Sequence, residues 1–271
     1  MKTFVTLAAL YILLICGCGK ESQPVKEKTK VVVAIDATLV PMTFMNDNNE
    51  LDGFEIDLMR EAGKAAGLDV EFVNVEWTGL FGGLITKKYD MVISSVTILE
   101  ERKQRMAFSI PYLKSGLALV VRKDSEGVET LADAEKKNLL VGAHVGTTSY
   151  FFLDQHPGIR KRGYQQYGHA IADLIKGDID AVVGESSGTL YYKNRQSEDF
   201  QKLKMVGEIL TEEYYGIVLR QEDKELMQKV NNALARLIGD GTLQKLHTKW
   251  DLGKAASVPT VQPGFRSEES R

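Results

Sequence analysis

Residues 90–102 read DMVISSVTILEER, an apolar run that ends in small hydroxyl residues and is followed by an arginine five positions after Thr97. A strand that ends in this way leaves backbone groups and hydroxyls available at its tip. A guanidinium can hold a carboxylate through two parallel hydrogen bonds. The stretch therefore indicates an anion-binding strand end with Arg102 as its cation, although a Ser/Thr cluster before charged residues is also typical of a helix cap.

The rest of the chain alternates between strand-like and helix-like segments. Residues 30–36 and 89–94 have the apolar runs of buried strands, and residues 53–67 have the apolar spacing of a helix. This alternation predicts an α/β fold with largely parallel sheets, in which ligands bind beyond the carboxyl ends of the strands. Several polar residues fall at such ends, which predicts that they converge on one site: Asp36, residues 94–97, residues 146–148 and Glu185.

Composition and charge argue against several classes of partner. The 271-residue chain has 34 Lys and Arg against 37 Asp and Glu, a net charge of −3 with both signs interspersed. Such a distribution offers no basic patch, so no nucleic-acid partner is predicted. The four histidines lack the spacing of metal ligands, and we find no glycine-rich phosphate loop. The sequence therefore predicts no metal and no cofactor.

The first residues have the pattern of a targeting segment. Residues 1–17 contain an early lysine and a nearly unbroken apolar stretch, as in a bacterial signal peptide. A glycine before Cys18 resembles a lipobox, which predicts a lipoprotein whose Cys18 carries the lipid, including palmitate. An ordinary signal peptide with incidental cysteines is the alternative. Cleavage before Cys18 would remove Cys16 and leave no disulfide.

Short motifs spread over residues 31–252 together resemble a known family. Residues 53–58 are similar to its GFDxDL motif, residues 100–112 to its EERK…FSxPY motif, and residues 180–183 to a strand of its second lobe. Each motif alone is unspecific, but their order along the chain is specific. The chain thus resembles the polar amino-acid-binding proteins of bacterial ABC importers, solute-binding protein family 3.

The resemblance implies a periplasmic-binding-protein-like fold, in which two α/β lobes are joined by two crossover strands and hold a ligand between them. The two ends of the chain are polar, which predicts flexible segments there. The expected division is a tether at residues 18–30, lobe 1 at residues 31–119 plus 218–252, lobe 2 at residues 121–216, crossovers near residues 120–122 and 216–218, and a disordered tail at residues 253–271.

The implied function is that of an extracytoplasmic receptor, not an enzyme. It would bind a free amino acid between two closing lobes and deliver it to the permease subunits of an ABC transporter. It would be a monomer, anchored by lipid to a bacterial membrane and facing the periplasm or the extracellular side. Cyclohexadienyl dehydratases also resemble this family, and in them an acid in the cleft serves catalysis, so such an enzyme is the alternative.

The resemblance also assigns partners to the two charged groups of an amino acid. It implies that Arg102 holds the ligand's carboxylate, with Thr148 at a helix start on the opposite lobe, where N–H groups favour an anion. It implies that the ammonium group binds the Ser95 carbonyl, the Thr97 hydroxyl and the acid Glu185. The family more often has Asp at the position of Glu185, and a solvated loop acid is the alternative for that residue.

The pocket for the ligand's side chain departs further from the family. Leu39 stands where a stacking aromatic is frequent, and Trp77 is either the remaining platform or a core residue. Asp36 would suit a basic ligand, although Asp is common there whatever the ligand. His144 is either a pH-sensitive contact or a buried neutral side chain. The expected ligand is a polar or basic amino acid.

Overall fold

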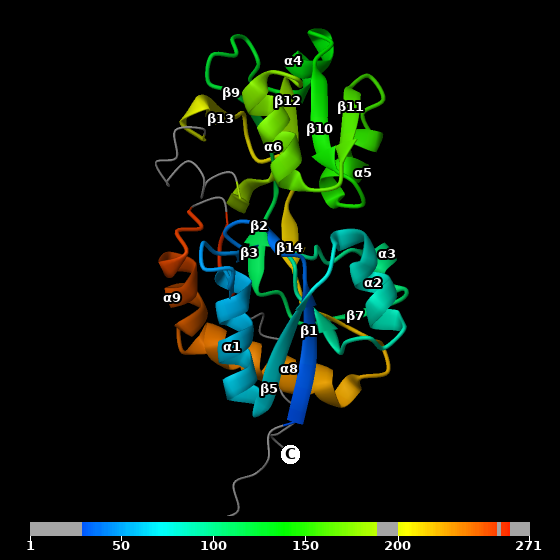
Figure 1. Ribbon diagram of the computed structural model, residues 1–271, viewed down its shortest axis with the longest axis vertical. Helices are drawn as coiled ribbons and strands as arrows, with labels where there is room; N and C mark the ends of the chain where they lie inside the picture. The colour runs from blue at the N-terminus through cyan, green and yellow to red at the C-terminus, as the bar shows by residue number, and fades with distance from the viewer. Residues whose placement is uncertain (1–28, 189–199, 254–255, 261–271) are drawn as a thin grey trace, which may run out of the picture.

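The computed structural model describes residues 29–188, 200–253 and 256–260, so the signal segment, Cys18 and most of the expected tether lie outside the described residues. The described chain forms two α/β lobes stacked along the long axis of the molecule (Figure 1). Each lobe is built on a five-stranded sheet. The predicted α/β fold with two lobes is therefore confirmed.

The sheet of lobe 1 has the order β5-β1-β6-β15-β7. Its first three strands run parallel, whereas β15 is antiparallel to both β6 and β7. Consecutive residues of β1 are buried, as expected of a strand that is covered on both faces. Its strands are β1 (Thr29–Ile35), β5 (Leu68–Asn74), β6 (Met91–Val92), β7 (Ala107–Phe108) and β15 (Val218–Leu219).

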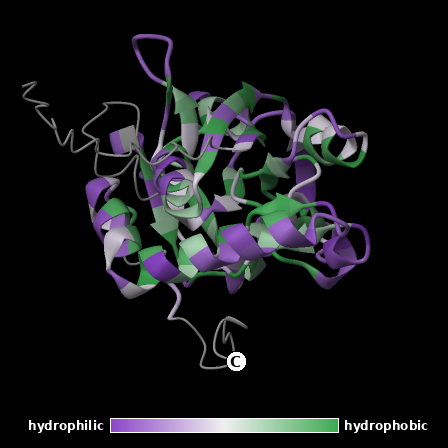
Figure 2. Cartoon of the chain, turned by 90° about the horizontal axis from the view of Figure 1, so that it is seen from below, coloured by the Kyte–Doolittle hydropathy of each residue, from purple (hydrophilic) through white to green (hydrophobic). Residues whose placement is uncertain are grey.

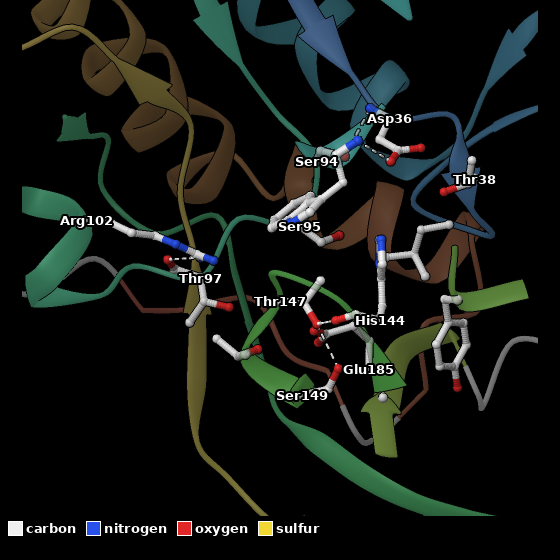
Figure 3. A pocket seen from close by; sticks show the side chains of 15 residues that line it. Asp36, Thr38, Ser94, Ser95, Thr97, Arg102, His144, Thr147, Ser149 and Glu185 are labelled. Atoms are coloured by element: carbon white, nitrogen blue, oxygen red, sulfur yellow. Dashed lines mark hydrogen bonds between the residues drawn. The ribbon is translucent and has the colours of Figure 1, made fainter. Parts of the chain in front are cut away.

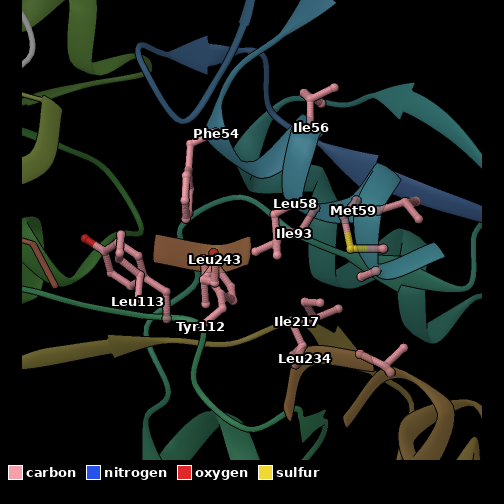
Figure 4. Close-up of a cluster of buried hydrophobic side chains, with 14 of the residues drawn as sticks. Phe54, Ile56, Leu58, Met59, Ile93, Tyr112, Leu113, Ile217, Leu234 and Leu243 are labelled. Atoms are coloured by element: carbon pink, nitrogen blue, oxygen red, sulfur yellow. The ribbon is translucent and has the colours of Figure 1, made fainter. Parts of the chain in front are cut away.

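Helices cover both faces of this sheet. Val33 and Ile35 of β1 pack in one apolar cluster with α1, α8 and α9, whereas Ala34 between them packs with α2 on the other face. Figure 4 shows the larger cluster, in which Phe54 of α1 and Leu234 of α8 point toward a shared interior. The helices are α1 (Phe54–Ala66), α2 (Trp77–Ile85), α3 (Glu100–Lys103), α8 (Lys224–Gly239) and α9 (Thr242–Lys249).

The sheet of lobe 2 has the order β11-β10-β12-β9-β13, with β9 antiparallel to both of its neighbours. Apolar clusters lie on both of its faces. Figure 2 shows apolar residues concentrated on the strands and hydrophilic ones on the outer surfaces of helices. The elements are β9 (Leu117–Arg122), α4 (Leu131–Lys136), β10 (Leu140–His144), α5 (Thr148–Asp154), β11 (Arg160–Tyr164), α6 (Tyr167–Lys176), β12 (Ala181–Glu185), the 3-10 helix η1 (Phe200–Lys202) and β13 (Leu203–Val206).

Two short strands, β8 (Leu113–Ser115) and β14 (Glu213–Tyr215), pair antiparallel between the lobes (Figure 1). The crossover predicted near residues 120–122 is wrong, because those residues belong to β9 and pair with β12 and β13 inside lobe 2. The second predicted crossover, near residues 216–218, begins directly after β14, but its last residue, Val218, already belongs to β15 and pairs inside lobe 1. Residues 117–121 are all buried, as expected of a strand that is covered on both faces.

A small sheet and the last described segment complete lobe 1. The small sheet consists of β2 (Thr38–Leu39), β3 (Thr43–Met45) and β4 (Leu51–Asp52). Ala256 is buried in the lobe 1 cluster, and the backbone of Ser257 exchanges two hydrogen bonds with Lys114. The disordered tail predicted from residue 253 is therefore wrong for residues 256–260, because apolar side chains there pack on lobe 1 and the backbone of Ser257 pairs with the edge of β8.

Across the described ranges we find no helix that is both long and apolar enough to span a bilayer.

Candidate functional site

One pocket lies between the lobes and brings together all nine residues that the sequence analysis assigned to a ligand (Figure 3). Its volume is about 530 Å³ when the space that opens to solvent is included. The strand ends supply much of the lining, since β1, β6, β10 and β12 all end beside it, as expected for parallel α/β sheets. The nine residues are Asp36, Leu39, Trp77, Ser95, Thr97 and Arg102 from lobe 1 and His144, Thr148 and Glu185 from lobe 2.

Arg102 lies on α3 with its guanidinium over the rings of Trp77 and Phe81, 5.7 and 5.4 Å from the ring centroids. Its Nη1 donates to the Thr97 carbonyl at 3.0 Å. Burial lowers the pKa of Arg102, and the nearby carboxylates of Glu213 and Glu185 oppose that shift. In the part of the chain that the structure describes, Arg102 forms no ion pair within 4.0 Å. The site thus holds a half-buried cation that an incoming anion would stabilise.

Ser95 is held in an unusual backbone conformation, with a φ of 50°, at the point where the chain leaves β6 for the pocket. Glu55 of α1 fixes it, because one carboxylate oxygen accepts from the Ser95 N–H at 2.6 Å and from its hydroxyl at 3.1 Å. The Tyr112 hydroxyl donates to the same oxygen. Glu55 is completely buried, and this burial raises its pKa to about 7. A positive φ at a non-glycine residue persists only where the surroundings impose it, and Glu55 does so here.

We expect Glu55 to make the stability of the protein depend on pH. Because its folded pKa is raised from 4.5 to about 7, its contribution is complete below 4.5 and is lost as pH rises through 7. The loss amounts to roughly 3 kcal/mol of unfolding free energy. The Glu55→Gln variant should lack this decline in urea titrations across the same range. Glu61→Gln, which removes a charge from the same helix, is the matched control, and an unchanged decline in Glu55→Gln would contradict the assignment.

Asp36 and Trp77 are linked at the start of α2. One carboxylate oxygen of Asp36 accepts from the Trp77 N–H at 2.8 Å, and the Asp36 N–H donates to the Ser94 hydroxyl at 3.1 Å. Asp36 thereby anchors the first turn of α2, a role that does not depend on the ligand. The Trp77 indole donates to the Gly146 carbonyl at 3.0 Å, which connects lobe 1 to lobe 2. Trp77 is 8% exposed and is therefore both a core residue and part of the pocket lining.

His144 lies at the end of β10, with its ring centroid 6.0 Å from that of Trp77. Burial lowers its pKa from 6.5, and the carboxylate of Asp36 partly opposes this shift. Its Nε2 is buried and has no hydrogen-bond partner among the described residues. These features favour a neutral imidazole, the second of the two roles that the sequence left open.

Glu185 ends β12 and lies beside two further polar residues of the interlobe region, Tyr215 and Glu213. The Tyr215 hydroxyl donates to Glu185, and burial together with the nearby Glu213 carboxylate raises the pKa of Glu185 well above its ordinary value. Arg102 opposes this shift. Glu213 and Tyr215 alternate along β14 and are both buried, whereas Tyr214 between them is not. An acid at an inward position of a short strand is the sequence signal that could have identified Glu213.

Other residues line the pocket without having been predicted. These additional lining residues are mostly hydroxyl-bearing: Thr38, Ser94, Thr147, Ser149, Tyr167 and Gly184.

Within the described ranges, we find no group of three or more His, Cys, Asp or Glu side chains placed to hold a metal.

The chain is similar to known amino-acid-binding proteins. A family model for bacterial extracellular solute-binding proteins, family 3, matches residues 31–254. The chain is 33% identical over 252 residues to the L-cystine-binding protein TcyJ of Escherichia coli (strain K12), covering 90% of this chain and 93% of that protein. It is 33% identical over 227 residues to the ABC transporter arginine-binding protein 1 of the same strain, covering 82% and 90%. The crystal structure of the ancestral amino acid-binding protein AncCDT-1, a precursor of cyclohexadienyl dehydratase, matches with a TM-score of 0.76 and 33% identity over 82% of this chain and 95% of that one.

Proposed function

Because the chain belongs to the bacterial extracellular solute-binding proteins, family 3, we propose that its interlobe pocket binds a free amino acid for delivery to an ABC importer. The observation that carries this proposal is Arg102, a half-buried guanidinium in the pocket that lacks an ion-pair partner among the described residues. A charge that is partly removed from water gains from an opposite charge, so a ligand carboxylate that pairs with Arg102 would stabilise the complex.

The acid Glu185 complements the second charged group of an amino acid, its ammonium group. Glu185 and the carbonyl and hydroxyl oxygens of the segment that follows β6 offer acceptors for the ammonium group, which lies next to the carboxylate on the α-carbon of an amino acid. Since Arg102 lies on lobe 1 and Glu185 on lobe 2, the ligand would favour the closed arrangement. The paired strands β8 and β14 would absorb the rotation between lobe 1 and lobe 2.

The remaining lining supports a polar or basic amino acid as the ligand. The side chain would lie among Asp36, Leu39, Trp77 and His144, which combine an acid, an apolar surface and two rings. Asp36 already uses one oxygen at the start of α2, so its charge, rather than a fully free carboxylate, would attract a cationic side chain. L-cystine and L-arginine, the ligands in the names of the two relatives, are both polar amino acids.

A thermal-shift screen of the ligand-free protein against the common amino acids and L-cystine tests this function. A ligand present at 100 times its Kd adds about 2.7 kcal/mol to the unfolding free energy, enough for a clear rise in Tm. We expect a rise with one chemical group of amino acids. The absence of a rise with any of them would contradict the proposal.

The cellular location follows from the targeting segment and is part of the proposal. We infer that residues 1–17 are a signal peptide and that Cys18 carries a lipid anchor on the extracytoplasmic side of a bacterial membrane, with the protein acting as a monomer. Cells grown with labelled palmitate should incorporate the label into the unmodified protein and not into Cys18→Ser. Equal labelling of the two proteins, or no labelling of either, would exclude the anchor on Cys18.

The raised pKa of Glu185 supports one alternative, because a protonated acid in a cleft can act as a general acid. A dehydratase acting on prephenate would use Glu185 in this way. The relatives compared above are named as binding proteins, which favours the receptor. Incubating the purified protein with prephenate and monitoring aromatic product separates the two functions, since only the enzyme would form it.

A further inference from the structure

Glu213 is a buried acid at the junction of the lobes and is not one of the residues that line the pocket. It begins β14, where it pairs with Ser115 of β8, and it is only 5% exposed. The adjoining strand end of lobe 1 is fastened to β14, because Ile98 donates to the Tyr214 carbonyl at 2.8 Å and Gly216 donates to the Val96 carbonyl at 3.1 Å. The carboxylate is therefore held at a fixed place beside Thr97.

Three hydroxyl groups converge on this carboxylate. Oε2 accepts from Thr97 of lobe 1 at 2.6 Å and from Thr148 of lobe 2 at 3.0 Å. Oε1 accepts from Thr211 at 3.0 Å. The Thr211 hydroxyl in turn accepts from the Leu117 N–H at 2.9 Å, so its own proton is directed toward Glu213. Glu213 thus receives hydrogen bonds from both lobes and from the strand region between them.

These hydrogen bonds determine what Thr97 and Thr148 can offer to a ligand. A threonine hydroxyl has a single proton, and a carboxylate only accepts hydrogen bonds. With that proton directed to Glu213, each hydroxyl presents only lone pairs to the pocket that both residues line. Lone pairs complement an ammonium group and repel a carboxylate. Thr148 would therefore contact the ligand's carboxylate through its backbone N–H and not through its hydroxyl.

We propose that Glu213 is a positioning residue that turns the hydroxyls of Thr97 and Thr148 into acceptors for the ligand's ammonium group. It thereby makes the pocket select amino acids over the corresponding acids that lack an α-amino group. This inference rests on the proposed function. It adds a residue that does not contact the ligand itself but determines specificity by orienting the hydroxyls of Thr97 and Thr148. Because one hydroxyl comes from each lobe, the selection is complete only in the closed arrangement.

Calorimetric titration of paired probes tests the inference. The probes are L-arginine, L-histidine, L-glutamine and L-cystine, each paired with the acid that has hydrogen in place of the α-amino group. In Glu213→Ala we expect affinity for the amino acid to fall about 10- to 100-fold, the effect of one lost hydrogen bond to a charged group. Affinity for the matching deamino acid should stay within about threefold, since it makes no ammonium contact.

Two further variants distinguish positioning from a general structural effect. Glu213→Gln keeps an amide oxygen that accepts from both hydroxyls, so it should retain more of the selectivity than Glu213→Ala. Thr148→Val removes one acceptor with little change in shape and gives the same selective loss even if Glu213→Ala does not fold. Glu212→Gln is the matched control, because Glu212 lies beside Glu213 but forms an exposed ion pair with Lys114.

The outcomes separate this inference from the function on which it rests. The positioning role would be overturned if Glu213→Ala and Thr148→Val lost equal affinity for an amino acid and for its deamino acid. It would also be overturned if neither affinity fell. Both outcomes would leave the receptor function intact. Failure of the unmodified protein to bind any of the four amino acids would overturn the proposed function and this inference with it.

Discussion

Replacing Arg102 by alanine is expected to lower the affinity for the amino acid by about 100- to 1000-fold, the range for removing one partner of a buried charge pair. The ligand's carboxylate would then be buried without its cation. The ligand-free variant should melt at the same temperature as the unmodified protein or slightly above it. Burial lowers the pKa of Arg102, which means that the folded state disfavours its charged form, so removing the charge does not weaken the empty protein.

Calorimetry and thermal melting of the ligand-free protein, measured on the same preparations, check both halves of this prediction. Arg105→Ala is the matched control, because Arg105 lies one turn beyond Arg102 in an exposed position outside the pocket. A folded Arg102→Ala variant with undiminished affinity would exclude Arg102 as the carboxylate partner. A large drop in Tm without ligand would instead indicate that Arg102 supports the fold through its contact with the Thr97 carbonyl.

Local sequence patterns were sufficient to predict much of the fold. The apolar run before Asp36 and the helical spacing that ends at Gly67 are encoded within a few residues of each element, and both were found as expected. Gly67 adopts the left-handed conformation that ends α1. The convergence of polar residues on one pocket also follows from local information, because strand ends of parallel sheets share one edge.

The features that escaped prediction depend on contacts between distant parts of the chain. The apolar run of β9 was compatible with a crossover or with a central strand, and only its pairing with β12 and β13 decides between them. Glu213 is separated by 116 residues from Thr97 and by 65 from Thr148, so nothing near it in the sequence reveals its partners. The anchoring of α2 by Asp36 likewise joins positions 41 residues apart.

Replacing Glu185 by glutamine should change ligand binding and the stability of the empty protein in opposite directions. Affinity for the amino acid is expected to fall about 10- to 100-fold, because the ammonium group loses its charged partner. Stability should rise above that of the unmodified protein at neutral pH. The folded pKa of Glu185 is raised, so its stabilising contribution is present below 4.5 and is lost as pH rises through the folded pKa. Glutamine cannot ionise and avoids that loss.

The same raised pKa predicts that binding of the amino acid releases a proton, because an ammonium group beside Glu185 favours its ionised form. Titrations in buffers of different ionisation enthalpy should therefore give different binding heats for the unmodified protein and equal heats for Glu185→Gln. Glu185→Asp, which keeps the charge on a shorter side chain, is the control and should retain the buffer dependence. A Glu185→Gln variant that loses affinity and Tm together would show that Glu185 supports the structure through Tyr215 rather than binding the ammonium group.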